Sequence, residues 1–117
     1  MRINEVIYTD ALPVDGYGPG FFRVGGTARE GPVLLSAKGV SGWGGYGDAE
    51  SLLALADEID VLLVGTGAEI AHIPGDLRDR LEAAGIGVEV MASGPACRSF
   101  NVLLSEGRRI ALAALPV

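Results

Sequence analysis

Three polar side chains lie close together near the start of a predicted helix, and their types could support chemistry. They are Cys97, Arg98 and Asn101, and Ser93-Gly94-Pro95 precedes them with the cap and early proline typical of a helix start. Unpaired N–H groups and the helix dipole favour a thiolate or a bound anion there, and Asn101 follows Cys97 by one turn on the same face. The alternative is that Cys97 is a small buried apolar group and that Asn101 hydrogen-bonds a neighbouring loop.

A thiol nucleophile needs a base, and none adjoins Cys97 in the sequence. His72 is the only histidine, and it lies in a different predicted loop. We therefore expect neither a nucleophile–base pair nor, from one histidine among scattered carboxylates, a metal site. The carboxylates that do cluster, Asp57, Glu58 and Asp60, are expected to form a solvated rim. The sequence thus predicts no metal and no cofactor.

A second candidate for chemistry is Gly65-Thr66-Gly67, which follows a predicted buried strand. A glycine pair in that place suggests a dinucleotide-binding turn, but Ile70 stands where the fingerprint requires a third glycine, and no helix begins at Gly67. The favoured interpretation is a tight turn at the carboxyl end of a central strand. Open α/β sheets bind ligands at that end, so the loop from Gly65 to His72 remains a candidate.

Two aromatic residues, Trp43 and Tyr46, lie in the most glycine-rich loop, residues 39–47. They could anchor a protein partner at an exposed surface. Packing against the core is the favoured interpretation, because a single tryptophan in a small domain has a large apolar area to bury.

Composition excludes several classes of function. The 117 residues carry nine Lys and Arg against fifteen Asp and Glu, a net charge of −6, and Lys38 is the only lysine. Without a basic stripe we expect no nucleic-acid binding. The most apolar region, residues 52–64, is interrupted by three carboxylates and cannot span a bilayer. The single cysteine cannot form an internal disulfide, and together with the lack of a signal peptide it predicts a cytoplasmic protein.

The first part of the chain is predicted to be mainly β structure. We expect strands at residues 3–9, 21–24 and 33–37, the last two paired as a hairpin, with a turn cluster over 15–20. Asp48 is a predicted N-cap for a helix over 49–57.

The second half of the chain predicts a β-α-β unit over residues 59–91. A nearly continuous apolar run at 59–64 indicates a strand covered on both faces, and Pro74-Gly75-Asp76 begins a helix that Gly85 ends. Within it Asp76–Arg80 and Arg78–Glu82 have the spacing of ion pairs, and a parallel strand follows at 86–91. The helix at Ser93 ends at Gly107, and a last strand covers 109–115. These elements predict one α/β domain over residues 1–117, of two or three layers, with a mixed sheet.

Four stretches resemble a known family, in order and over nearly the whole chain: residues 15–24, 60–70, 77–91 and 96–104. They are similar to the small α/β family that includes mitochondrial NADH:ubiquinone oxidoreductase (complex I) assembly factor 3, whose bacterial and archaeal members form a domain of unknown function. The resemblance implies a bacterial member with three layers, a mixed central sheet and a small additional β-layer. The glycine-rich loop at 42–47 and the absence of a mitochondrial presequence depart from the family's pattern.

The function implied by the resemblance is a non-catalytic protein-binding or assembly module with an unidentified protein partner. The alternative is a small-anion-binding protein, or an enzyme, that uses one cleft. That cleft would combine two segments if they meet at one edge of the sheet, with these candidate residues: Gly65, Thr66, Gly67, Cys97, Arg98 and Asn101.

Overall fold

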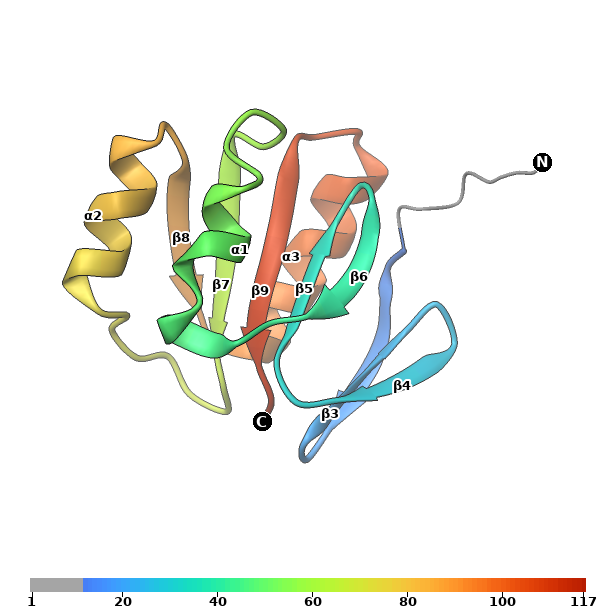
Figure 1. The fold of residues 1–117 in the computed structure, drawn as a ribbon. Coiled ribbons are helices and arrows are strands. Elements are labelled where there is room, and N and C mark those ends of the chain that lie inside the picture. Colours follow the sequence, from blue (N-terminus) through green and yellow to red (C-terminus); the bar gives the residue numbers. More distant parts are fainter. Residues whose placement is uncertain (1–11) are drawn as a thin grey trace.

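A computed structural model describes residues 12–117, and its strands form two sheets (Figure 1). The smaller sheet has the order β2-β3-β4 and the larger has the order β6-β5-β9-β7-β8. The bounds of the strands are β2 Val14–Gly18, β3 Phe21–Val24, β4 Thr27–Glu30, β5 Val33–Ser36, β6 Gly39–Gly42, β7 Val61–Thr66, β8 Gly87–Met91 and β9 Ile110–Leu115. The strand expected at residues 3–9 lies outside the described residues.

The five-stranded sheet is mixed, as predicted. β7 pairs in parallel with β8 on one side and with β9 on the other, whereas β5 pairs antiparallel with β9 and with β6. The helix α2 (Gly75–Ala83) connects β7 to β8 and α3 (Ser93–Ser105) connects β8 to β9, so the predicted β-α-β unit is confirmed.

Helices cover both faces of this sheet. The helices α1 (Ala49–Leu53) and α2 lie on one face and α3 lies on the other (Figure 1). Side chains of β7 alternate between two cores: Leu62 and Val64 pack toward α1 and α2, and Leu63 packs toward α3. The three layers and the mixed sheet are therefore as expected.

The small sheet adds a β-layer beside α3. Phe22 and Val24 of β3 are buried in the same core as Phe100 of α3. This is the small additional β-layer that the family resemblance implies.

The predicted hairpin between residues 21–24 and 33–37 is wrong. β3 pairs with β2 and β4, while β5 belongs to the other sheet. The reason lies in Gly25-Gly26, where φ values of 58° and 84° form the two-residue turn that joins β3 to β4. The two glycines end β3, as predicted, but they also turn the chain directly into the next strand, β4.

The turn cluster expected at residues 15–20 is a strand for most of its length. β2 covers Val14–Gly18, and only Pro19 and Gly20 form the turn into β3. At Gly18 a Cβ would lie 2.6 Å from the Phe21 ring, so any other residue there would need that ring to move. Similarly, the first part of the glycine-rich loop is the edge strand β6.

The rest of that loop packs as predicted. Trp43 is buried, its indole N–H donates to the Asp48 carbonyl at 3.2 Å, and its ring meets Tyr46 edge-on at 5.9 Å. Asp48 caps α1 by accepting from the backbone N–H and the hydroxyl of Ser51. The pKa of Asp48 is lowered because the Ser51 hydroxyl and two backbone N–H groups stabilise its carboxylate. The helix itself ends at Leu53, four residues earlier than predicted.

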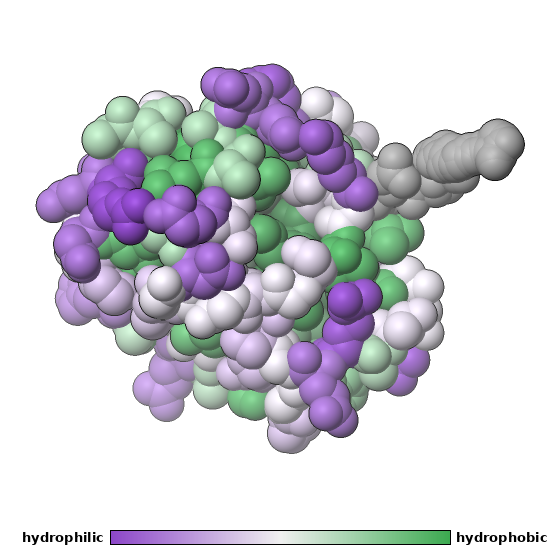
Figure 2. All heavy atoms as spheres, in the orientation of Figure 1, coloured by the Kyte–Doolittle hydropathy of each residue, from purple (hydrophilic) through white to green (hydrophobic). Residues whose placement is uncertain are grey.

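In α2, the predicted end at Gly85 is confirmed by its φ of 87°. Arg78 pairs with Glu82 at 3.4 Å as expected, but Arg80 pairs with Glu50 of α1 at 3.0 Å instead of Asp76. Figure 2 shows strongly hydrophilic residues over α2 on the left of the view. Within residues 12–117, no helix is long and apolar enough to cross a membrane.

Candidate functional site

The first turn of α3 meets the carboxyl end of β7 through Ser93, which is fully buried. The Ser93 hydroxyl donates to the Leu115 carbonyl at 2.5 Å and accepts from the Gly67 N–H at 2.8 Å. The Ser93 N–H donates to the Gly67 carbonyl at 2.8 Å. Ser93 is therefore not the N-cap that its sequence predicted: Ala92 takes that position, and Ser93 joins three segments of chain.

Gly65 and Gly67 are both buried at this junction. A Cβ on Gly65 would lie 2.7 Å from the Ser93 hydroxyl and 2.9 Å from its Cα, so glycine lets β7 and α3 approach closely. Thr66 organises the following loop, because its hydroxyl donates to the Glu69 carbonyl at 2.7 Å and accepts from the Ala71 N–H at 3.1 Å. The three residues thus form a tight turn at the strand end.

Cys97 lies on the inner face of α3 and is 2% exposed. Burial raises the pKa of its thiol to about 11, and the neighbouring Arg98 opposes this only in part. The expectation that the helix start favours a thiolate is wrong, because desolvation of the thiolate outweighs the adjacent cation. Cys97 instead takes the alternative role of a small apolar group.

Alkylation by iodoacetamide is expected to show directly that the Cys97 thiol is buried and protonated. A pKa of about 11 leaves about one Cys97 thiol in a thousand ionised at pH 8. In the native chain the thiol should therefore react on the order of a hundredfold more slowly than a free cysteine, and each pH unit up to about 11 should raise the rate tenfold. The same chain in urea supplies the control, and native alkylation at pH 7 as fast as that of free cysteine would contradict the assignment.

Asn101 holds the small sheet against α3. Its side-chain oxygen accepts from the Val14 N–H at 2.8 Å, and its amide donates to the Val14 carbonyl at 2.9 Å. Both backbone groups at the start of β2 are thereby paired, which is the structural alternative considered for Asn101.

Replacing Asn101 with alanine is expected to lower the free energy of unfolding by about 2 kcal/mol, since two hydrogen bonds to a buried residue are lost. Ser99→Ala on the same helix is the matched control, because its hydroxyl makes only a long 3.7 Å contact with the Met91 sulfur. Urea unfolding of both variants tests this, and equal losses would show that Asn101 is not a specific link.

The six predicted site residues lie in different surroundings. Gly65 and Gly67 meet the first turn of α3, Cys97 is in the core, and Asn101 bonds β2. Arg98 is exposed and lines a shallow hollow with Ser99, Val102 and Leu103, which contains none of the other five.

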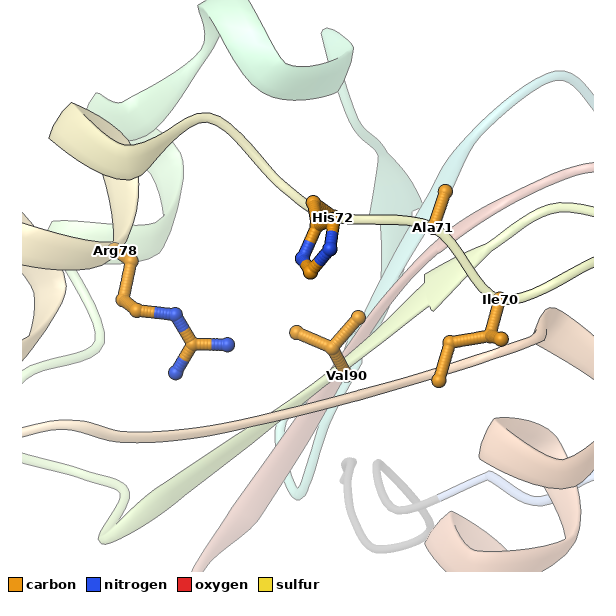
Figure 3. A pocket seen from close by; sticks show the side chains of 5 residues that line it. All are labelled: Ile70, Ala71, His72, Arg78 and Val90. Carbon is orange, nitrogen blue, oxygen red and sulfur yellow. The ribbon is translucent and has the colours of Figure 1, made fainter.

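A different hollow lies over β8. Of the segments that line it, the sequence had indicated only the loop from Gly65 to His72. It measures about 270 Å³ and is lined by Ile70, Ala71, His72, Arg78 and Val90. Figure 3 shows the His72 ring and the Arg78 guanidinium pointing into the space above Val90. The signal that could have found it is the alternation of β8, in which Val88 and Val90 face α2 next to an exposed isoleucine.

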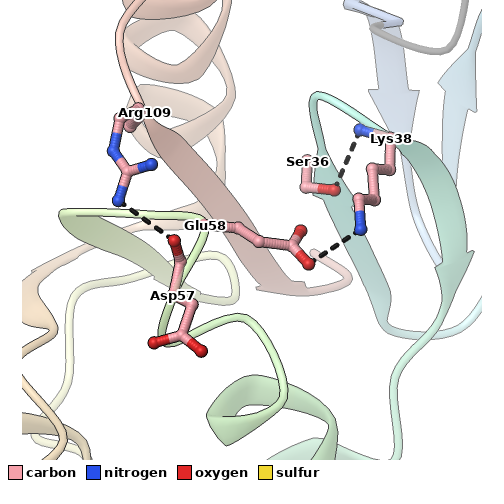
Figure 4. Close-up of polar contacts among 5 residues, drawn as sticks. All are labelled: Ser36, Lys38, Asp57, Glu58 and Arg109. Carbon is pink, nitrogen blue, oxygen red and sulfur yellow. Dashed lines mark hydrogen bonds and ion pairs between the residues drawn. The ribbon is translucent and has the colours of Figure 1, made fainter.

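Two of the three carboxylates of the acidic rim, those of Glu58 and Asp60, are paired with cations. Glu58 binds Lys38 at 2.8 Å, and Arg109 contacts the Asp57 carbonyl at 3.3 Å (Figure 4). Arg109 also contacts the Asp60 carboxylate at 3.4 Å. Across residues 12–117, no group of three or more potential metal ligands gathers. The exposed ion pairs contribute little stability.

Comparison with known proteins assigns the chain to one family. The family described as "Protein of unknown function (DUF498/DUF598)" matches residues 14–115. An uncharacterized protein of Rhodobacter capsulatus is 49% identical over 117 residues, all of this chain and 94% of that protein. The NADH dehydrogenase [ubiquinone] 1 alpha subcomplex assembly factor 3 of Danio rerio is 35% identical over 107 residues. That match covers 86% of this chain and 62% of the relative, so the chain spans about three-fifths of the assembly factor's length.

A solved structure shares the architecture. It is described as an outer membrane protein from Bartonella henselae, with a TM-score of 0.84 and 34% identity over 93% of this chain and 98% of that one. The mixed sheet and the extra β-layer are thus found in a protein of similar sequence.

Proposed function

Since this chain belongs to the family of proteins of unknown function DUF498/DUF598, we propose that it is a non-catalytic protein-binding module that assists the assembly of another protein. Relatives of this family are named as assembly factors, which supports the proposal. Those relatives are longer than this chain, and their assembly role is carried over to this chain only as part of this proposal.

The observation that carries the proposal is a pair of exposed apolar side chains beside the outermost strand. Ile70 is 68% exposed and Val102 is 55% exposed. Ile70 lines the hollow over Val90, and Val102 lies one turn after Ser99, whose hydroxyl contacts Met91 of β8. An apolar surface rimmed by polar groups is typical of a protein interaction site. We call the surface made by Ile70, His72, Arg78 and Val90 the β8 face. Val102 belongs to α3, on the other side of the sheet next to the same edge.

Binding is favoured over catalysis because the side chains that could do chemistry serve the fold. The Cys97 thiol is buried with a raised pKa, and the Asn101 amide and the Ser93 hydroxyl each hold two backbone groups. We place the protein in the cytoplasm, and the unpaired thiol of Cys97 supports this location.

Photocrosslinking in cells of the source organism tests the function. A benzophenone amino acid replaces Ile70 in one variant and Val102 in another, and a third variant carries it at the exposed Ala28 of β4 as a control. We expect the same partner protein to be crosslinked at Ile70 and at Val102 but not at Ala28. Crosslinking at both positions no stronger than at Ala28 would overturn the proposed function.

A further inference from the structure

In the part of the chain that the structure describes, β8 is an edge strand, and the backbone groups on its outer edge lack a partner. The Gly87 N–H donates to the Asp60 carbonyl at 2.8 Å, so alternation turns the N–H and C=O of Gly87, Glu89 and Met91 toward β7. The N–H and C=O of Val88 and Val90 therefore point away from the sheet. Within residues 12–117 no backbone or side-chain group bonds them. Two donors and two acceptors in this arrangement match the main chain of one further strand.

The side chains around the edge define what that strand must carry. Val88 and Val90 face α2, so residues paired with them would point to the same side, where the hollow of about 270 Å³ offers an apolar floor. Glu89 is exposed and faces the opposite side of the sheet. The residue opposite Glu89 is therefore favoured when it is basic.

A second copy of this chain does not fit the same edge. The antiparallel arrangement that pairs all four free groups places Val88 opposite Val90, and it therefore places Glu89 opposite Glu89. Like charges in directly opposed positions destabilise a strand pair. The net charge of −6 repels a second copy as well and attracts a basic segment.

We propose that β8 binds an extended segment of a different protein by strand addition, and that this segment carries a basic residue between two apolar residues. The basic residue pairs with Glu89, and an apolar neighbour enters the hollow between His72 and Arg78. This inference rests on the proposed function and specifies its binding mode.

The test selects binding peptides from a random displayed library, using the full chain as bait and Glu89→Lys as a second bait. Glu30→Lys is the matched control, because it changes the net charge equally at an exposed site on β4. The wild-type and Glu30→Lys chains are expected to enrich an apolar–basic–apolar pattern, and Glu89→Lys an apolar–acidic–apolar pattern. For one selected basic peptide, Glu89→Lys should weaken binding about threefold to tenfold. The amide signals of Val88 and Val90 should shift saturably with that peptide.

Three results would overturn the inference: no enriched pattern, the same pattern from the wild-type and Glu89→Lys baits, or signal shifts confined to elements other than β8. A partner crosslinked at Ile70 with equal yield in wild type and Glu89→Lys would likewise overturn strand addition, while leaving the proposed function intact. Loss of the crosslinks at both Ile70 and Val102 would instead remove the function itself.

Discussion

Ser93→Ala is expected to lower the free energy of unfolding by about 2–4 kcal/mol, although it removes a single oxygen atom. The Ser93 hydroxyl bonds the Gly67 N–H and the Leu115 carbonyl, and its loss leaves both without a partner at the junction of β7, α3 and β9. Each buried polar group left unpaired costs about 1–3 kcal/mol. Denaturant unfolding followed by circular dichroism measures the change through the midpoint.

The matched control is Ser105→Ala in the last turn of the same helix. The Ser105 hydroxyl donates to the Val102 carbonyl at 2.7 Å, but this bond is exposed and water can replace it. We expect a change within about 0.5 kcal/mol there. Equal losses at Ser93 and Ser105 would show that the buried serine does not join the three segments.

Gly65→Ala is the second substitution with a large expected effect, a loss of about 2–3 kcal/mol. The added Cβ would lie within 3.0 Å of the Ser93 hydroxyl and Cα and 3.1 Å from the Ala114 Cβ, and backbone must move to relieve this. Overpacking a close-packed interior typically costs about 1–3 kcal/mol.

Gly75→Ala controls for the change of residue type. Gly75 begins α2, and a Cβ there meets nothing within 4 Å, so we expect an unchanged or slightly raised stability. Thermal unfolding of the two variants compares them directly. A Gly65→Ala protein as stable as Gly75→Ala would mean that β7 and α3 are not in close contact.

The sequence predicted the second half of the fold better than the first. The apolar run of β7, the helix spacing of α2 and the stop at Gly85 all reflect local rules, and the structure confirms them. The residue patterns missed the small sheet, which only the family resemblance implied, because glycine both ends strands and forms the tight turns between them. Nothing local to Gly25-Gly26 says which neighbouring strand β3 pairs with.

The candidate site was hard to predict because burial depends on long-range packing. Cys97 has the local surroundings of a reactive thiol, and only the core around Phe100 shows that it is desolvated. Asn101 pairs with Val14, 87 residues away in sequence. The β8 face likewise joins a loop, the helix α2 and an edge strand, and its open edge follows from the strand order alone.

Amide hydrogen exchange of the chain, free and bound to the partner crosslinked at Ile70, is the most direct test that a partner docks at the β8 face by adding a strand to β8. Binding is expected to slow exchange at Val88 and Val90 strongly, because their N–H groups gain acceptors. Exchange at the opposite edge strand β6, Gly39–Gly42, should stay unchanged. Unchanged exchange at Val88 and Val90 in the complex, or protection confined to β6 or to the small sheet, would contradict the account.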